Sequence, residues 1–430
     1  MISRQLRRGR EHYIVVLVLV IFFVISLFTN ILGPIIPEII RSFQLSLTAA
    51  GFLPFAFFLA YGLMSIPSGL LIEALSEKAI IVGAFLLSLA GALAFALFPK
   101  YSVATTSLFS IGVGMAALQV ALLPLLRVAG GEEHFAFNSA LVQLVFGSAS
   151  FLSPHLYSYL LRELGAGNTG NLLLRILARL TPAQLPWASL YWVFAAVSIA
   201  MILVVLLSRF PKVERKEEEQ AGSWATHGKM FRSSVVVLFF ISTFMYVGSE
   251  QGLSNWMSQF LATYHQLDPR TAGANAVSWF WGLMTLGCLL GLLLLKIFDS
   301  RKVLIGTSTL ALVFLTAALF GPANVSRLAF PAIGLFASMM WPVIISLGLN
   351  SVAEHHGTVS GILCTGIVGG AVMPLVIGQI GDHFGLRAGM AFLYLTLGWV
   401  LSIGFWARPL IGNQTISRQR EPQPAASLSS

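Results

Sequence analysis

The stretch YIVVLVLVIFFVISLF, from Tyr13 to Phe28, carries no charged side chain and decides the fold class. Mostly apolar residues continue it to residue 40, and about 20 such residues are enough for a helix to cross the hydrocarbon core of a bilayer. The run is too long and too strongly continued for a cleaved signal peptide. We therefore predict a membrane-spanning helix in this part of the chain.

The composition of the whole chain agrees with a membrane protein. Of its 430 residues, 57% are hydrophobic and 10% are charged, whereas a soluble domain has about 25% charged residues. This composition excludes a soluble globular domain, a disordered chain and a collagen-like repeat. The two cysteines, Cys288 and Cys364, lie in apolar runs and suggest neither a disulfide scaffold nor a metal or redox site. Most of the protein surface must face lipid.

Eleven further stretches resemble the first in length and hydropathy, so we predict an all-α membrane protein with twelve transmembrane helices. The predicted spans are 13–40, 48–72, 79–98, 102–127, 135–162 and 187–210, followed by 233–262, 270–297, 303–321, 325–350, 357–381 and 386–410.

The net charge of +9 is explained by membrane topology rather than by nucleic-acid binding, because the basic residues lie between apolar segments and form no single patch. An even number of spans places both termini on the same side. If that side is the cytoplasm, it receives 18 of the 26 Lys and Arg residues, as the positive-inside rule requires. We expect a multi-pass protein of the inner cell membrane with both termini cytoplasmic, a monomer without a nucleic-acid partner.

The chain divides into two halves of six spans each. A charged cytoplasmic linker, 211–232, separates the half at 1–210 from the half at 233–410, and the tail at 411–430 is rich in Ser, Gln and Pro and is predicted to be disordered. Between the fifth and sixth spans, residues 171–179 have the pattern of a short amphipathic helix on the outer surface, where we expect it to act as a cover.

An internal repeat supports this division. Tyr61-Gly-Leu-Met64 in the second span recurs as Trp281-Gly-Leu-Met284 in the eighth. Each is followed by two small residues spaced four apart, which let helix backbones approach closely. Two six-helix halves of this kind form the major facilitator fold, in which the substrate site lies between the halves near the middle of the membrane.

Polar side chains within the spans are the candidates for such a site, because a polar group in lipid is costly unless it faces a cavity or a partner. Glu250, in the seventh span, is the deepest acidic residue, and it is either a cavity residue or a fixed contact between helices. Gln251, Asn255 and Gln259 recur at intervals of four and so share one helix face. Other amides and tryptophans lie at similar depth, although a membrane tryptophan also serves as packing or as an interfacial anchor. The predicted substrate-binding residues are Asn30, Gln119, Gln143, Gln251, Asn255, Trp256, Gln259, Trp281 and Trp341, with Glu250 as the candidate for ion coupling.

This set of side chains indicates the chemistry of the ligand. Amides both donate and accept hydrogen bonds, and aromatic rings pack on the apolar faces of sugars, so the set suits a small neutral sugar. An anionic substrate would require a deep Lys or Arg. The sequence contains no catalytic constellation and no Walker-type phosphate loop. We therefore expect neither an enzyme nor an ATP-driven pump, and no metal or cofactor.

Three stretches carry a family resemblance. Tyr246-Val-Gly-Ser-Glu250 is similar to the Y-V-G-x-E of the fucose, galactose and glucose symporter family of the major facilitator superfamily, and Ser278-Trp-Phe-Trp-Gly282 is similar to its aromatic-Trp-Gly. Most specific are Ser360-Gly-Ile-Leu-Cys364 and Ile367-Val-Gly-Gly-Ala371, which resemble that family's S-G-L-L-C and I-V-G-G-A. The resemblance covers the chain from the first span to the twelfth. It implies two halves that rock about a mid-membrane sugar site, with a proton carried by an Asp in the first helix and a Glu in the fourth.

The chain departs from this family at the proton carriers. Asn30 stands where the resemblance places the Asp, and Gln119, five residues before Pro124, stands where it places the Glu. Neither amide can take up and release a proton. Two hypotheses follow: an uncoupled transporter whose amides donate hydrogen bonds to sugar hydroxyls, or a transporter coupled to H⁺ or Na⁺ at Glu250. Gln143 matches a family Gln in the fifth helix and is a candidate sugar contact.

Two other functions are compatible with the same scaffold. A lipid or drug exporter, which the 32 Phe residues would favour, predicts an apolar cavity that opens sideways to lipid. A receptor that does not transport would retain the fold alone. A sugar carrier predicts an enclosed polar cavity, and the fold by itself does not choose among the three.

Overall fold

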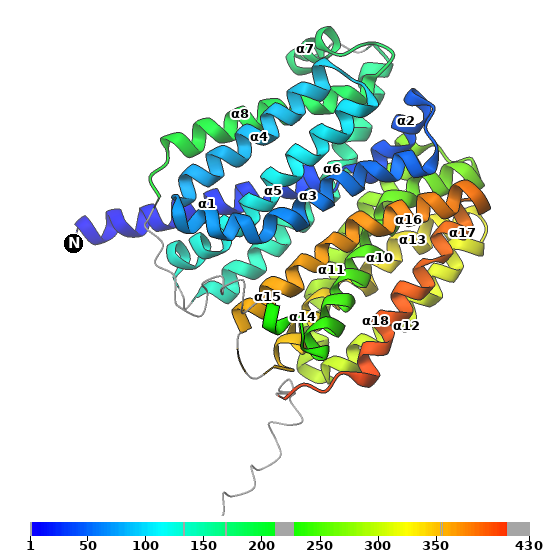
Figure 1. Cartoon of the computed structure of the whole chain (residues 1–430). Coiled ribbons are helices and arrows are strands. Elements are labelled where there is room, and N and C mark those ends of the chain that lie inside the picture. Colours follow the sequence, from blue (N-terminus) through cyan, green and yellow to red (C-terminus); the bar gives the residue numbers. More distant parts are fainter. Residues whose placement is uncertain are drawn as a thin grey trace, which may run out of the picture.

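The computed structural model describes residues 2–131, 134–167, 170–210, 228–352, 354 and 356–410. Within them the chain forms two bundles of helices that lie side by side (Figure 1). The first bundle contains α1 (Ile2–Thr29), α2 (Leu32–Phe43), α3 (Leu47–Ala74), α4 (Glu77–Leu97), α5 (Tyr101–Gly130), α6 (Phe135–Gly165), α7 (Leu172–Leu180) and α8 (Ser189–Leu207). The second contains α10 (Ser234–His265), α11 (Ala274–Ile297), α12 (Ser300–Phe320), α13 (Ala323–Ala337), α14 (Met340–Leu349), α15 (His356–Thr365), α16 (Gly369–Phe384), α17 (Leu386–Ala391) and α18 (Leu393–Trp406).

The predicted fold class is confirmed. Eleven helical segments of the described residues are long and apolar enough to span a bilayer. The remaining predicted span corresponds to α6, which has 31 residues but is interrupted by polar side chains such as Asn138, Gln143 and His155. These twelve segments make two six-helix halves. Most of the predicted linker, residues 211–227, and the predicted tail, 411–430, lie outside the described residues.

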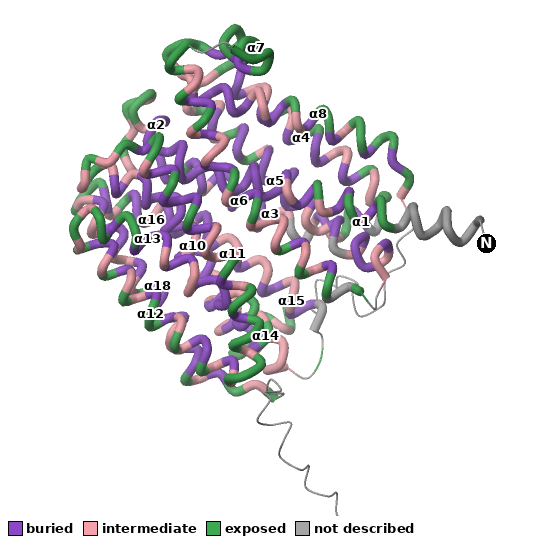
Figure 2. The backbone as a smooth tube through the Cα atoms, turned by 180° about the vertical axis from the view of Figure 1, so that it is seen from behind, coloured by how far each residue is buried: buried purple, intermediate pink, exposed green. Residues whose placement is uncertain are grey.

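Buried apolar side chains form one cluster in each half. A few residues at the contact between the halves pack into the cluster of the other half. Ala274 and Ala371 of the second half belong to the first cluster. Ile36 and Ala50 of the first half belong to the second cluster. Buried residues concentrate along this contact, whereas exposed residues lie on the outer helices and on α7 (Figure 2). Each half therefore has its own core, and the boundary between them is a separate packing surface.

Four predicted spans are broken helices. α1 gives way to α2 at Asn30, α13 to α14 at Ser338, α15 to α16 through the 3₁₀ turn Gly366–Val368, and α17 to α18 at Phe392. Pro34 and Pro342 follow the first two breaks by four residues, and proline has no N–H to donate to the carbonyl four residues earlier. Broken backbone at membrane depth is tolerated where it lines a cavity, so the breaks point to one.

The two ends of the bundle differ. At the terminal end, defined here as the end where α1 begins and α18 finishes, the chain enters and leaves the bundle (Figure 1). The opposite end carries α7, the short helix predicted at 171–179. α7 buries Leu174 and Leu177 against the bundle and leaves Arg175 and Arg179 exposed.

Candidate substrate site

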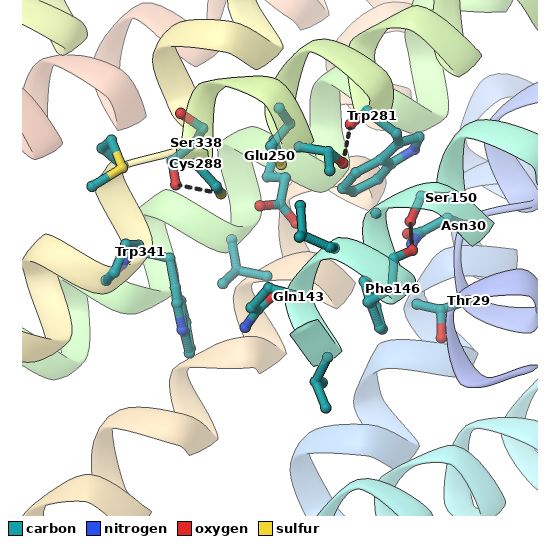
Figure 3. A pocket seen from close by; sticks show the side chains of 18 of the residues that line it. Thr29, Asn30, Gln143, Phe146, Ser150, Glu250, Trp281, Cys288, Ser338 and Trp341 are labelled. Carbon is teal, nitrogen blue, oxygen red and sulfur yellow. Dashed lines mark hydrogen bonds between the residues drawn. The ribbon is translucent and has the colours of Figure 1, made fainter. Parts of the chain in front are cut away.

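A cavity of about 420 Å³ lies between the two halves, with walls from α1, α3, α5 and α6 on one side and α10, α11 and α14 on the other. Along α11 its lining runs from Trp281 to Leu295, and along α6 from Ser150 to Ala140. Because α11 finishes at Ile297 and α6 starts at Phe135 at the terminal end, the cavity extends from the middle of the bundle toward that end. Figure 3 shows side chains of both halves converging on it.

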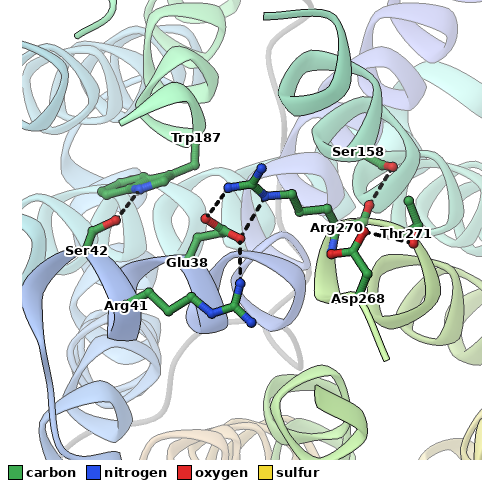
Figure 4. Close-up of polar contacts among 8 residues, drawn as sticks. All are labelled: Glu38, Arg41, Ser42, Ser158, Trp187, Asp268, Arg270 and Thr271. Carbon is green, nitrogen blue, oxygen red and sulfur yellow. Dashed lines mark hydrogen bonds and ion pairs between the residues drawn. The ribbon is translucent and has the colours of Figure 1, made fainter. Parts of the chain in front are cut away.

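An ion pair between the halves closes the opposite end (Figure 4). The Glu38 carboxylate on α2 accepts two hydrogen bonds from the Arg270 guanidinium, at 2.9 and 3.0 Å. The Glu38 side chain is 6% exposed, and Arg41 approaches the same carboxylate at 3.7 Å. Arg270 lies in the short turn Pro269–Gly273 before α11, and its carbonyl accepts a hydrogen bond from the Ser158 hydroxyl of α6 at 2.6 Å.

A second link between the halves lies at the same end. The Asp382 carboxylate, on α16, accepts hydrogen bonds from the backbone N–H groups of Leu47 and Thr48, at 2.7 and 2.8 Å. These donors belong to the first turn of α3, where N–H groups have no partner within the helix. The two links therefore hold different helix pairs together while the cavity extends toward the terminal end.

The first half contributes neutral amides and hydroxyls to the cavity. The Asn30 amide donates to the Ser150 hydroxyl at 2.8 Å, and the Ser26 and Ser150 hydroxyls are 2.7 Å apart. Gln119 and Gln143 also line the cavity. Neither makes a hydrogen bond to another described residue, which leaves both amides available to a ligand.

The second half contributes the carboxylate. One oxygen of Glu250 accepts a hydrogen bond from the Tyr246 hydroxyl at 2.6 Å, and the other accepts one from the Gln251 amide at 3.2 Å. No described Lys, Arg or His forms an ion pair with it. Trp281 is 5% exposed and its indole N–H has no partner among the described residues. The Trp341 ring lies 6.2 Å from that of Tyr246, centroid to centroid.

The structure places three of the predicted substrate residues outside the lining of the cavity. The Asn255 amide donates to the Gln251 carbonyl at 2.8 Å, and the Trp256 indole donates to the Pro374 carbonyl at 2.9 Å. Gln259 bonds to Thr263 at 3.1 Å, further along α10. The physical reason is that α10 passes from the cavity into the closed contact with α2, so its later turns are packed and self-bonded.

The other predicted residues lie together around the cavity. They are Asn30, Gln119, Gln143, Glu250, Gln251, Trp281 and Trp341.

The α11 side of the cavity also has an apolar wall that the sequence did not predict. Met284, Cys288, Leu289, Leu292 and Leu295 line the cavity. Their spacing of three and four residues identifies one helix face, and that face continues from Trp281. The spacing could have been recognised, but an apolar face on a membrane helix usually contacts lipid or another helix, so it gave no reason to assign a cavity.

Two helical halves around a central cavity that is closed at one end are the architecture of a membrane transporter that works by alternating access. Residues 18–367 match the family model of the Major Facilitator Superfamily, and the chain belongs to this superfamily. It is 30% identical over 382 residues to the glucose/galactose transporter of Brucella abortus, covering 87% of this chain and 88% of that protein. It is 26% identical over 390 residues to the L-fucose-proton symporter of Escherichia coli, covering 85% and 86%.

The solved structures agree on the fold. A crystal structure of the Escherichia coli fucose:proton symporter FucP aligns over 93% of this chain and 99% of that one, with a TM-score of 0.64 and 21% identity. These comparisons confirm the resemblance to the sugar symporter family that the sequence motifs indicated.

Proposed function

We propose that this protein is a secondary transporter that moves a small neutral sugar, of hexose size, across the membrane by alternating access. The observation that carries the proposal is the convergence of Asn30, Gln119, Gln143 and Gln251 on one cavity between the halves. Amides pair with sugar hydroxyls as donors and as acceptors. The names of the relatives, a glucose/galactose transporter and an L-fucose-proton symporter, support the same substrate class.

The direction in which the cavity faces follows from charge. The terminal end carries Lys78, Arg127, Lys296 and Lys302 near its helix ends, and positive residues favour the cytoplasmic side. We place both termini in the cytoplasm of a cell whose inner membrane holds the protein. The described structure is then the inward-facing state, with Glu38 and Asp382 closing the outer side.

Coupling is proposed in two alternative forms. Asn30 and Gln119 cannot exchange protons, so the protein is either an uncoupled carrier or a symporter that uses Glu250. Glu250 lies in the cavity with neutral partners only, as a carboxylate that takes up H⁺ or Na⁺ during transport would require. No other cofactor is part of the proposal, and the transporter is expected to act as a monomer.

Uptake by proteoliposomes tests the proposal. The purified protein should accumulate or equilibrate at least one labelled hexose faster than protein-free liposomes do. An imposed proton or sodium gradient should drive accumulation if Glu250 couples transport, and should have no effect if the carrier is uncoupled. Absence of uptake across a panel of hexoses, under every gradient, would contradict sugar transport.

A matched pair of variants links the uptake to the cavity. Gln143→Leu removes an unpartnered amide from the cavity and should raise KM about tenfold, equivalent to about 1.4 kcal/mol. Gln259→Leu makes the same substitution in a helix but outside the cavity, and it should leave KM within about twofold of the wild-type value. Equal effects of the two substitutions would show that the cavity does not bind the sugar.

The apolar wall of α11 supports a second candidate function, export of an amphiphile, because Leu289, Leu292 and Leu295 could contact an acyl or aromatic group. Energised efflux of a lipophilic dye from cells that express the protein, without uptake of any hexose, would favour that function over sugar transport.

A further inference from the structure

The charge of the cavity is unbalanced. Among the described residues that line it, Glu250 is the one charged side chain, and no Lys, Arg or His is present. The donors on its two oxygens, Tyr246 and Gln251, are both neutral. An ionised carboxylate in a site of low polarity is costly without a cation. When the cavity closes around its cargo, Glu250 must therefore either take up a proton or lie beside a cation.

The surroundings of Glu250 suit an organic cation. Each carboxylate oxygen has two lone pairs and accepts one hydrogen bond, so each can accept another. The rings of Tyr246 and Trp341 lie next to each other at this level, and Trp281 also lines the cavity. Ring faces and a carboxylate together stabilise an ammonium group. No group of three or more His, Cys, Asp or Glu side chains that could hold a metal ion exists among the described residues.

The polar groups opposite Glu250 favour an organic cation that also carries several hydroxyl groups. The unpartnered amides of Gln119 and Gln143 and the Asn30–Ser150 pair come from the facing half, and Figure 3 shows Glu250 directed toward the side chains of that half. An amine without hydroxyl groups would leave these amides unpaired, at a cost in binding. A sugar that carries an ammonium group would satisfy both sides of the cavity.

We propose that the site binds protonated amino sugars as a further substrate class, with Glu250 as the counter-charge of the ammonium group. The proposal rests on the sugar-transport function above. A neutral hexose with a protonated Glu250 and an amino hexose with an ionised Glu250 give the same net charge in the loaded cavity. Glu250 would thus be protonated when a neutral hexose is bound and ionised when an amino hexose is bound.

Equilibrium binding to the purified full-length protein at about pH 7 tests the proposal with three probes: glucose, glucosamine and N-acetylglucosamine. Glucosamine should bind at least about tenfold more tightly than glucose, because a charge-assisted hydrogen bond replaces a neutral one. N-acetylglucosamine, which has the nitrogen but no charge, should show no such preference. Glu250→Gln should reduce the glucosamine-to-glucose preference to about one, and Glu250→Asp should retain it.

The outcomes separate the two proposals. If glucose and glucosamine bind with equal affinity to the wild-type protein, or if the preference survives Glu250→Gln, the amino-sugar assignment is overturned while sugar transport stands. If none of the three probes binds and no hexose of the panel above is taken up by proteoliposomes under any gradient, sugar transport itself is overturned. The wild-type comparison needs no variant, so misfolding of Glu250→Gln does not remove the test.

Discussion

At the scale of single residues, the cavity presents neutral amides at the two positions where the sequence resemblance places the acids of a proton-coupled transporter. Asn30 lies at the break between α1 and α2 and is held by Ser150 of α6, whereas Gln119 on α5 is unpartnered. An amide resembles a protonated carboxyl in shape and can donate a hydrogen bond, but it cannot release a proton. We therefore interpret the first-half wall as a permanent mimic of the protonated carboxyl groups of a symporter.

Restoring both acids tests this interpretation. Asn30→Asp combined with Gln119→Glu should make hexose uptake depend on pH, with faster uptake at acid pH, because the two new carboxyl groups must be protonated before they can replace the amides as donors. Initial uptake rates between about pH 5 and 8 should change at least about tenfold in the double variant. Gln266→Glu, which adds a carboxylate to an exposed loop residue, should leave the wild-type profile unchanged, and a flat profile in the double variant would refute the interpretation.

The sequence indicates how deep a polar residue lies in the membrane, but not whether its side chain reaches the cavity. The interval of four correctly placed Gln251 and Asn255 on one face of α10, yet only Gln251 lines the cavity. One turn later, a Cβ on Gly33 would collide with the backbone carbonyl of Ser254, so α2 and α10 are in backbone contact there. Periodicity gives the face of a helix but not the length over which that face is open.

At the scale of helices, hydropathy predicted the spans because each must cover the same hydrocarbon thickness. It did not predict the breaks at Asn30, Ser338, Gly366 and Phe392, since a broken span remains equally apolar. Prolines 34 and 342 gave the local reason for two of them. The links through Glu38 and Asp382 were also unpredicted, because they join residues more than 200 positions apart and depend on which conformational state is populated.

The Glu38–Arg270 pair should control opening of the outer side. Glu38→Gln removes the charge that pairs with Arg270, and losing one partner of a buried pair is destabilising. Because Arg270 is 44% exposed, we expect about 1.4 kcal/mol rather than the full cost of a buried charge, or a tenfold shift toward the outward-facing state. In a Cys364→Ser background, Cys288 in the cavity becomes the single thiol of the chain.

Thiol labelling measures that shift. An impermeant maleimide added from the outer side should label Cys288 about tenfold faster in Glu38→Gln than in the wild-type background. Glu163→Gln is the matched control, because Glu163 lies at the same end but pairs with its neighbour Arg162 at 3.0 Å within one half. Unchanged labelling in Glu38→Gln, or equal acceleration by Glu163→Gln, would exclude the pair as an outer lock.

At the scale of the whole molecule, the separate cores of the two halves allow them to move as units. The contact between them relies on close approach of backbones: a Cβ on Gly378 would meet the Leu47 carbonyl, as one on Gly33 would meet that of Ser254. Such contacts, together with two hydrogen-bonded links, can be broken without unfolding either core. Rocking of the halves then exposes the same cavity to each side in turn.

The two outer links should act independently, because Glu38 joins α2 to the turn before α11 and Asp382 joins α16 to α3. Free-energy effects of separate sites add when the residues share no partners. Asp382→Asn removes the charge from both hydrogen bonds and leaves one oxygen to accept from only one of the two α3 N–H groups. It should accelerate Cys288 labelling from the outer side severalfold. In the double variant with Glu38→Gln, the acceleration should equal the product of the single effects. A double variant no faster than Glu38→Gln alone would mean that the Asp382 link holds the halves together only while the ion pair is intact. The two links would then be coupled rather than independent.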